Sequence, residues 1–260
     1  MKKREMEALL YDWHNNIKLH NQNKDINFYK KIIKNKNNAN ILIIGAGTGR
    51  VAIPLSDNNK VVALDKNIER LNRLRKKIKS KNKLEIVNVD IKDYKTKKRF
   101  DYIIIPYSTM QNIYPKSKQK KVLRNIKKLL KEDGICIIDN SNKFKEFRSE
   151  GYKDVCNGFC SERKMFINEY EKCITHKKYI ILKQKFVSDN KNVLKKKERW
   201  NILNEKDFER MIMAEKLIIN NKIYGYDEFT KHRVIYFLNK EKKDERTKSK
   251  NNVYKSNRKL

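Results

Sequence analysis

The sequence predicts an α/β fold in which a mostly parallel sheet is covered by helices on both faces. Three observations support this prediction. Between residues 40 and 140, short runs of β-branched residues alternate with longer amphipathic stretches, the rhythm of strands joined by crossover helices. A glycine-rich turn, GAGTGR, follows the first apolar run. Two acidic residues, Asp65 and Asp90, end later runs, where parallel strands bring side chains to one edge of the sheet.

Five strands are expected in this region, each a short run rich in Ile, Val or Leu. They are residues 41–45, 60–65, 83–90, 100–106 and 134–139. Residues 67–79 and 116–131 repeat apolar side chains at spacings of three and four, which predicts two helices with one buried face each. Gly134 follows the second of these stretches and is expected to end the helix.

The length of 260 residues suits one large α/β core with additions. No apolar run approaches the roughly 20 residues of a membrane span, so we expect a cytoplasmic protein without a membrane partner. Its cysteines are then expected to remain thiols. One array, Cys156, Cys160, Cys173 and His176, has the form CxxxC…CxxH. The first spacing is uncommon for structural zinc, and we expect no metal.

The charge of the chain is strongly unbalanced, with 64 Lys and Arg against 31 Asp and Glu, a formal net charge of +33. Basic surfaces attract phosphate backbones and acidic small molecules. Two interpretations stay open, a nucleic-acid partner and a lysine excess without a partner, as AT-rich coding produces. Residues 240–260 contain nine basic and three acidic side chains and few apolar ones, which predicts a disordered basic tail.

The turn GAGTGR predicts a nucleotide-type binding cradle. A turn from a strand into a helix is expected to expose backbone N–H groups, and Gly45 and Gly47 let a ligand approach without a Cβ in the way. The spacing is GxGxG, because Arg50 occupies the third glycine position of the dinucleotide-binding pattern GxGxxG. Asp65 is placed to accept both hydroxyls of a ribose, and Asp90 to accept an adenine amine.

These motifs resemble the core of the class I S-adenosylmethionine (SAM) dependent methyltransferases, in particular those with small-molecule acceptors. The resemblance covers residues 40–140 and rests on GAGTGRVAIPLS, VVALDKNIERL, VNVDIKDY, FDYIIIPYSTMQNI and LRNIKKLLKEDGICIID, in this order. Outside this region, ERWNILNEKDFERMI resembles a late strand, turn and helix of the family, and KHRVIYFLNK its closing strand. The resemblance implies a Rossmann-like sheet of seven strands, mostly parallel, with an antiparallel last strand.

The resemblance also implies a SAM site, with S-adenosylhomocysteine as the product. The implied cofactor-binding residues are Tyr11, Gly45, Ala46, Gly47, Gly49, Asp65, Lys66, Asp90, Ile91, Pro106 and Tyr107. The glycine turn would surround the methionine part, Asp65 the ribose, and Asp90 with Ile91 the adenine. Pro106 and Tyr107 would lie on the sulfonium side, and Tyr11 would close over the carboxylate. The family usually has an acid two residues before the first glycine, where this chain has Ile43.

We expect the chain to divide into five parts around this core. These are an N-terminal helical lid (1–39), the SAM-binding core (40–140), an inserted cap for the substrate (141–200), the C-terminal part of the core (201–239) and the basic tail (240–260). The segment 141–200 is too long for a simple connection. We expect part of it to be helical and part, including the strand-like run KYIILKQKFV, to extend the sheet or form a lid.

Methyl transfer from a sulfonium requires mainly an aligned acceptor, exclusion of water and, for some acceptors, removal of a proton. His14 and Tyr107 are the catalytic candidates, with His14 as the base; an ordinary surface helix is the alternative interpretation of His14. Other polar residues expected near the strand ends are Ser108, Gln111, Asn112, Asp139 and Asn140, and His20 is a second histidine of the N-terminal segment.

The function expected from these residues is methylation of an N or O atom of a small molecule or short peptide. Two alternatives stay open. A nucleic-acid base methyltransferase fits the charge, although it needs a polar residue where this chain has Ile104. A non-catalytic SAM-binding protein would follow from Ile43. The oligomeric state is not predicted.

Overall fold

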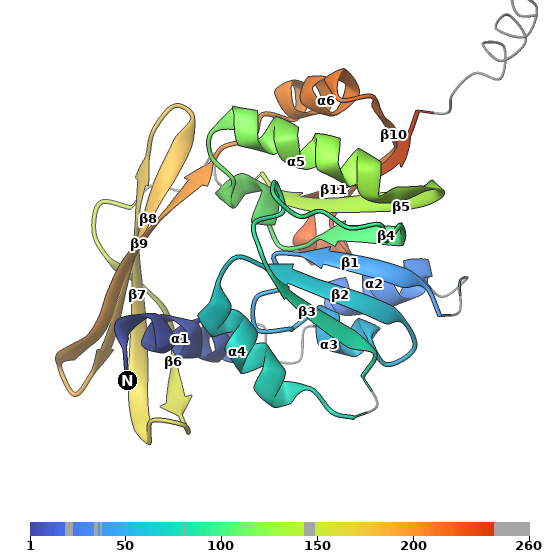
Figure 1. The fold of residues 1–260 in the computed structure, drawn as a ribbon. Coiled ribbons are helices and arrows are strands. Elements are labelled where there is room, and N and C mark those ends of the chain that lie inside the picture. Colours follow the sequence, from blue (N-terminus) through green and yellow to red (C-terminus); the bar gives the residue numbers. More distant parts are fainter. Residues whose placement is uncertain (19–22, 34–35, 37, 81, 143–148, 242–260) are drawn as a thin grey trace, which may run out of the picture.

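The computed structural model describes residues 1–18, 23–33, 36, 38–80, 82–142 and 149–241. The chain forms two separate sheets with helices around and between them (Figure 1). Among the described residues, no helix combines the length and apolar character needed to cross a membrane. The predicted basic tail lies almost entirely outside the described residues.

The larger sheet has seven strands in the order β10-β11-β5-β4-β1-β2-β3. Their bounds are β1 Asn40–Ile44, β2 Lys60–Asp65, β3 Leu84–Asn88, β4 Phe100–Ile105, β5 Leu130–Ser141, β10 Leu217–Tyr224 and β11 Arg233–Lys240. The pairs among β1 to β5 are parallel, and β11 runs antiparallel to both β5 and β10. This confirms the predicted seven-stranded, mostly parallel sheet with an antiparallel last strand.

Helices cover both faces of this sheet. One face packs on α5 (Lys116–Leu129) and α6 (Glu205–Ala214). The other face packs on α2 (Lys24–Ile33), α3 (Ala52–Leu55) and part of α4 (Ile68–Lys77). Short 3₁₀ helices, η1 (Thr109–Asn112) and η3 (Glu228–Thr230), complete the core. Each face of the sheet therefore has its own apolar cluster.

The predicted helices are present, with shorter ends. The side chain of Asn67 caps α4 by accepting hydrogen bonds from the N–H groups of Glu69 and Arg70. The expectation that Gly134 ends α5 is wrong, because α5 ends at Leu129 and β5 begins at the next residue. Gly134 lies inside β5, where a Cβ would come within 2.8 Å of the Phe100 carbonyl oxygen.

The smaller sheet is formed by residues 153–201 and is called the cap sheet here. Its strands are β6 Lys153–Cys160, β7 Met165–Thr175, β8 Tyr179–Ser188 and β9 Lys191–Asn201, antiparallel and in chain order. No helix lies in the described part of residues 149–200, and these strands do not extend the larger sheet. The expectation of a partly helical segment is therefore wrong for these residues. Asp189 and Asn190, both with positive φ, make the tight turn between β8 and β9.

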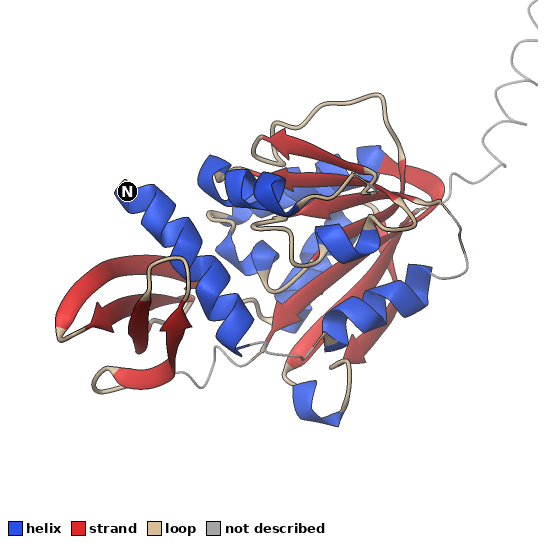
Figure 2. Ribbon diagram, turned by 90° about the horizontal axis from the view of Figure 1, so that it is seen from below, coloured by secondary structure: helices blue, strands red, loops and turns tan. Residues whose placement is uncertain are grey.

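Helix α1 (Lys3–Lys18) lies between the cap sheet and the larger sheet (Figure 2). Its apolar side, with Leu10 and Trp13, packs on Ile167 and Phe186 of the cap sheet. Its polar side is held to the core by Asp12. This buried carboxylate accepts hydrogen bonds from the Thr48 hydroxyl (2.8 Å), Lys77 (2.6 Å) and Arg73 (3.2 Å). The helix therefore links the cap sheet to the glycine turn of the core.

Candidate active site

A cavity of about 660 Å³ lies where the carboxyl ends of β1, β2 and β4 meet α1 and the cap sheet. From the core it is lined by Gly45, Ala46, Asp65, Lys66, Asp90, Ile91, Pro106 and Tyr107, and from α1 by Tyr11 and His14. The cap sheet contributes residues of β7, β8 and β9. Residues from the first half of the chain and from the insertion therefore share one chamber, of a size typical of small-molecule sites.

The glycine turn has the conformation that its sequence requires. Gly45, Gly47 and Gly49 have φ values of +75°, +56° and +92°, which disfavour any other residue. A Cβ at Gly45 would lie 2.5 Å from the Thr109 side chain, and one at Gly47 would lie 3.2 Å from the Tyr11 hydroxyl. Gly49 instead faces Leu74 and Ile53 and does not line the cavity. A glycine is needed at this position because a Cβ would clash with Leu74 when the turn packs against α4.

The backbone N–H groups of the turn are directed into the protein. Gly45 and Ala46 donate to the Leu64 carbonyl oxygen at 2.9 and 3.0 Å, and Gly47 donates to Asp65 Oδ2 at 2.8 Å. The expectation that the turn exposes these N–H groups is therefore wrong. The turn folds back on the end of β2, where carbonyl and carboxylate acceptors lie within reach. Its glycines leave open space beside the cavity, and the hydrogen bond from Gly47 fixes the orientation of the Asp65 carboxylate.

Asp65 ends β2 and is held by two backbone donors. Its Oδ2 accepts from Gly47 and its Oδ1 from Asn67, both at 2.8 Å, and the residue is 8% exposed. Each carboxylate oxygen keeps a second lone pair, so the side chain can accept further hydrogen bonds from a ligand in the cavity. Asp90 lies two residues beyond the end of β3, beside the buried side chain of Ile91.

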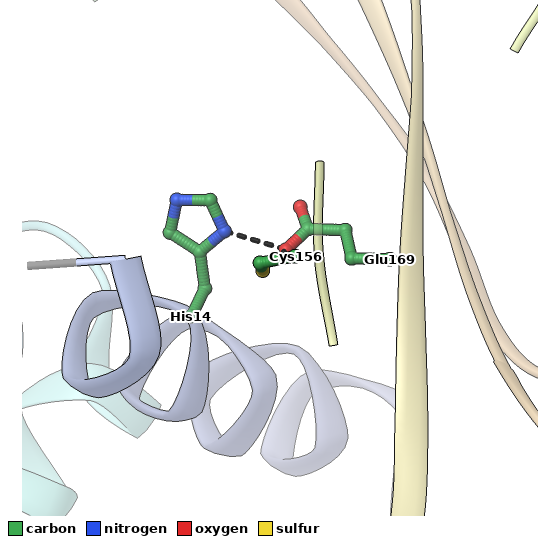
Figure 3. A group of neighbouring side chains, drawn as sticks. All are labelled: His14, Cys156 and Glu169. Atoms are coloured by element: carbon green, nitrogen blue, oxygen red, sulfur yellow. Dashed lines mark hydrogen bonds and ion pairs between the residues drawn. The ribbon is translucent and has the colours of Figure 1, made fainter. Parts of the chain in front are cut away.

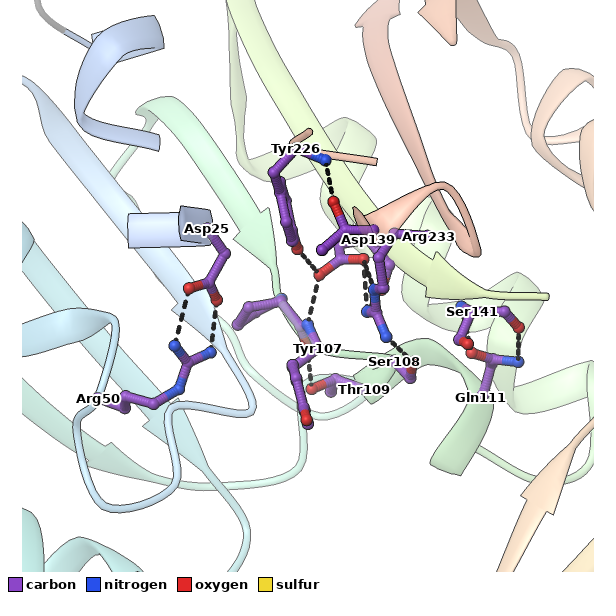
Figure 4. Close-up of polar contacts among 12 residues, drawn as sticks. Asp25, Arg50, Tyr107, Ser108, Thr109, Gln111, Asp139, Ser141, Tyr226 and Arg233 are labelled. Atoms are coloured by element: carbon purple, nitrogen blue, oxygen red, sulfur yellow. Dashed lines mark hydrogen bonds and ion pairs between the residues drawn. The ribbon is translucent and has the colours of Figure 1, made fainter. Parts of the chain in front are cut away.

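The loop after β4 is held in a strained turn. Tyr107 and Ser108 have φ values of +51° and +61°, the left-handed region that non-glycine residues seldom adopt. The fully buried Asp139 holds this turn, because its Oδ2 accepts the Tyr107 N–H at 3.0 Å and its carbonyl oxygen accepts the Ser108 N–H at 2.8 Å (Figure 4). Arg233 pairs with Asp139 and also donates to the Ser108 hydroxyl at 3.1 Å.

Two arginines flank the ring of Tyr107, which is 37% exposed. The guanidinium carbons of Arg50 and Arg233 lie 5.4 and 5.2 Å from its centroid. Arg50 is fixed by a two-point ion pair with Asp25 of α2, at 2.9 and 2.5 Å (Figure 4). A third guanidinium, that of Arg70, stacks on Tyr11 at 3.9 Å. Both aromatic rings beside the cradle are therefore held by cations.

These residues fit SAM. The positive-φ glycines leave space that a Cβ would fill, Asp65 presents a carboxylate at the end of β2, and the cavity continues from there past Asp90 and Tyr107. Ile43 is fully buried in the apolar cluster with Ile41, Ala63 and Ile104. The contact that an acid at this position makes in the family is therefore not made by residue 43 here.

The matches to known proteins agree with this site. Residues 41–134 match the model of a family described as a methyltransferase domain. Residues 41–134 are a class I, SAM-dependent methyltransferase domain. SAM is accordingly the expected cofactor of this domain. No curated protein sequence matches the chain significantly.

Solved structures with this fold include other methyltransferases. An S-adenosylmethionine-dependent methyltransferase from Clostridium acetobutylicum ATCC 824 has a TM-score of 0.74 and 18% identity, over 89% of this chain and 97% of that one. SAM-bound CalS10, an amino pentose methyltransferase from Micromonospora echinaspora, has a TM-score of 0.65 and 10% identity, over 84% and 90%. The sugar N-methyltransferase KedS8 from Streptoalloteichus sp ATCC 53650 has a TM-score of 0.67 and 8% identity, over 83% and 86%. At these low sequence identities, the structural similarity shows a shared fold.

Opposite the methyltransferase domain, His14 forms a pair with a buried carboxylate of the cap sheet. Its Nδ1 lies 2.5 Å from Oε2 of Glu169, which is fully buried, while its other ring nitrogen points away from Glu169 (Figure 3). The Cys156 thiol donates to the same Oε2 at 3.2 Å, and Gln184 donates to Oε1 at 2.7 Å. Every oxygen of this carboxylate is therefore hydrogen-bonded.

The Glu169 carboxyl is held in its ionised form. Burial by itself raises its pKa, but the hydrogen bond and charge of His14, with the hydrogen bonds of Cys156 and Gln184, outweigh burial and lower the pKa below its ordinary value. A carboxylate at Nδ1 favours the imidazole tautomer with the proton on Nδ1. The lone pair of Nε2 is then the one free to accept a proton.

Two further carboxylates of the cap sheet line the cavity, Glu171 and Glu198. Burial raises the pKa of Glu198, but the nearby charges of Lys196 and Arg70 outweigh it and lower that pKa below its ordinary value. The indole N–H of Trp200 also donates to Glu198 at 3.1 Å. The cap side of the cavity therefore presents carboxylates next to the basic side chains of Lys196 and Arg199.

The structure assigns different positions to the remaining candidates. Of the predicted cofactor-binding residues, only Gly47 and Gly49 do not line the cavity. Gln111 is buried and bonded to the backbone of Ser141 and Asn201, and Asp139 is engaged by Arg233. The side-chain amide of Asn140 is buried without a hydrogen-bond partner among the described residues. His20 lies outside the described residues.

The CxxxC…CxxH array does not assemble. In the described part of the chain, the group of His, Cys and carboxylate side chains close enough to share an ion is His14, Cys156 and Glu169. His176 instead stacks on the Tyr179 ring with centroids 4.4 Å apart. Cys156 and Cys160 lie in the apolar packing between the cap sheet and α1, and Cys173 lines the cavity.

Sequence reasoning missed Glu169, Glu171 and Glu198. A signal for the first two exists in the run INEYEKC, because they alternate with Ile167 and Cys173 at the period of a strand. Carboxylates on the apolar face of a strand are costly to bury and indicate a polar site beneath it. Glu198 has no comparable signal, since its neighbours in the chain are lysines and an arginine.

Proposed function

We propose that the protein transfers a methyl group from SAM to an amine nitrogen of a small molecule or short peptide. The observation that carries this proposal is the His14–Glu169 pair, which faces the cavity that Asp65 and Tyr107 also line. A proton acceptor and a cofactor cradle in one chamber are what methylation of a protonated acceptor needs.

The chemistry assigns a role to each part of the site. SAM, when bound, would supply a methyl carbon on a sulfonium; attack by a lone pair of the acceptor on that carbon would form the new bond as the C–S bond breaks and S-adenosylhomocysteine leaves. An amine at neutral pH carries a proton in place of that lone pair. Nε2 of His14 takes this proton, and Glu169 holds the imidazole in the correct tautomer and stabilises the imidazolium that forms. Closure of the chamber by α1 and the cap sheet keeps water from the reacting atoms.

Two carboxylates of the cap sheet support an amine acceptor. Glu171 and Glu198 line the cavity, and the charges of Lys196 and Arg70 outweigh burial and lower the pKa of Glu198 below its ordinary value. Each of these carboxylates can accept hydrogen bonds from an ammonium group of the acceptor. Two proteins of the same fold are described as an amino pentose methyltransferase and a sugar N-methyltransferase, which agrees with an amine acceptor.

The test compares wild type with His14→Gln on a panel of acceptors, amine-bearing monosaccharides and short peptides with free N-termini. Mass spectrometry measures the gain of a methyl group, and calorimetry measures the dissociation constant of SAM. We expect methylation of an amine by wild type, a rate about 10²- to 10⁴-fold lower in His14→Gln, and equal SAM binding in both.

The outcomes separate the alternatives. SAM binding without turnover on any acceptor would favour the non-catalytic protein. Methylation of O atoms only, or unchanged rates in His14→Gln, would contradict the amine proposal. A nucleic-acid base acceptor has less support, because Ile104, in the position of the required polar residue, is fully buried within β4.

A further inference from the structure

The two faces of the cap sheet differ in charge. Side chains alternate along a strand, and residues directly opposite each other on paired strands share a face. The face against α1 carries Phe186 and Leu194 with the carboxylates Glu169, Glu171 and Glu198 and with Lys196. The opposite face, called the outer face here, carries Lys172, Lys183, Lys185, Lys195 and Lys197.

The lysines of the outer face lie directly opposite one another. Lys183 pairs in register with both Lys172 and Lys197, and Lys185 pairs with Lys195. Like charges at opposite positions destabilise a sheet. At the paired strand positions of this face, the single carboxylate is Asp154, on the edge strand β6. One acid within the face offsets little of this repulsion, and an external polyanion would relieve it.

Aromatic rings are interleaved with these lysines. The ammonium group of Lys185 lies 5.7 Å from the ring centroid of Tyr170 and 6.0 Å from that of Tyr152. Phe159 and Phe166 are paired across β6 and β7 and are 60% and 52% exposed. Phe166 and Tyr170 are four residues apart on one strand, about 13 Å by the strand rise. Rings at this spacing can each stack a base, while the ammonium groups between them meet phosphates.

The outer face is open and broad. Helix α1 packs on the other side of the cap sheet (Figures 1 and 2). Its first two turns, with Lys3 and Glu7, reach a shallow pocket that Lys183, Lys195 and Lys197 also line. A face of four strands is too wide to enter the groove of a duplex, which admits a helix or a two-stranded ribbon. It suits an unpaired strand, whose bases are free to stack on a sheet.

We propose that the outer face of the cap sheet binds single-stranded RNA, which is the main unpaired nucleic acid of a cell. Phe159, Phe166 and Tyr170 stack bases, and the lysines of β8 and β9 contact phosphates. The face is turned away from the cavity, so the bound strand is not the methyl acceptor. It anchors the protein on RNA while the cavity stays open to its own substrate.

The experiment measures binding of a labelled oligouridine of about 12 nucleotides to the full chain by fluorescence anisotropy at several salt concentrations. One variant combines Lys183→Gln, Lys185→Gln, Lys195→Gln and Lys197→Gln. The matched control removes four exposed lysines of α5, with Lys116→Gln, Lys120→Gln, Lys121→Gln and Lys128→Gln. With about 0.7 counterion released per phosphate contact, we expect the slope of log affinity against log salt to fall by about 3 in the first variant. In the control it should fall by less than about 1.

Two further measurements separate a loss of RNA binding from a loss of folding, and base stacking from phosphate contacts. Removal of facing like charges should leave the melting temperature of the first variant unchanged or higher, which separates lost binding from lost folding. Phe166→Ala and Tyr170→Ala should each weaken binding about fivefold or more without changing the salt slope.

Three results would overturn the proposal. Equal losses in the two lysine variants would mean that only net charge attracts RNA. Binding of phosphatidylserine vesicles that depends on the outer face, with oligouridine binding unaffected by the same substitutions, would make the face a membrane surface. Tighter binding of oligothymidine of the same length would assign the face to single-stranded DNA.

Discussion

His14 and Glu169 lie 155 positions apart in the chain, and their side chains meet at 2.5 Å between α1 and β7. The contact exists because the apolar side of α1 packs on the cap sheet while Asp12 fixes its polar side to the core. A helix at the N-terminus and an insertion after the fifth strand therefore complete a cavity that begins at the glycine turn.

Replacement of Glu169 by Gln should lower the methylation rate by at least about tenfold, within the contribution of a positioned base. The imidazole loses the carboxylate acceptor that fixes its tautomer and orientation. Steady-state rates with the same acceptor and saturating SAM measure the effect. Cys156→Ala removes another donor to Glu169 and should leave the rate close to that of wild type. An equal loss of rate in both variants would indicate a purely structural role.

Replacement of Asp65 by Ala should weaken the binding of SAM and of S-adenosylhomocysteine by about 10- to 150-fold, which is about 1.5 to 3 kcal/mol for hydrogen bonds to a charged acceptor. Calorimetric titration measures the two dissociation constants. Because Asp65 also accepts from Gly47, the melting temperature of the variant is recorded alongside. Asp93→Ala, an exposed acid outside the cavity, should bind like wild type. Unchanged affinity in Asp65→Ala would place the ribose elsewhere.

Replacement of Asp139 by Asn should destabilise the fold by about 3 to 5 kcal/mol, because the buried Arg233 would keep its charge without a counter-ion. Urea denaturation measures the free energy of unfolding. The matched change Asp133→Asn removes an exposed partner of Lys36 and should cost less than about 1 kcal/mol. Similar values for both variants would mean that Asp139 and Arg233 are well solvated in the native protein.

The buried carboxylate of Asp101 should contribute to the acid sensitivity of the fold. Burial raises its pKa, but Lys131, Lys36 and the N–H of Asn40 outweigh burial, and the pKa lies below its ordinary value. A lowered native pKa adds stability above the ordinary carboxyl pKa, and this stability is lost as the pH falls toward the native value. The free energy of unfolding should therefore fall less steeply in Asp101→Asn than in wild type between about pH 6 and about pH 3. An equal slope would contradict this assignment.

Local features explain why much of the core could be predicted. The five strands and both helices of residues 40–140 follow from apolar periodicity, and the turn follows from its glycines, since each of these is set within a few neighbouring residues. The same reasoning misjudged the direction of the N–H groups at Gly45 and Gly47. Their acceptors, Leu64 and Asp65, lie on the next strand, and only the folded turn brings them within reach.

The cap was harder to predict for a physical reason. Residues 153–201 alternate apolar and polar side chains as strands do, but alternation does not tell whether a strand joins an existing sheet or starts another. That choice depends on α1, whose apolar side covers Ile167 and Phe186. The same packing buries Glu169 beside His14 and leaves the lysines of β8 and β9 on the opposite face.

The sequence by itself therefore determined the class of fold, the succession of strands and helices in the core, the glycine turn and the acid at the end of β2. Local periodicity and backbone chemistry suffice for these features. The tertiary structure alone decided which charges meet in the cavity and which face solvent. Pairing across 155 residues depends on how helices and sheets pack, and packing joins side chains that no local pattern connects.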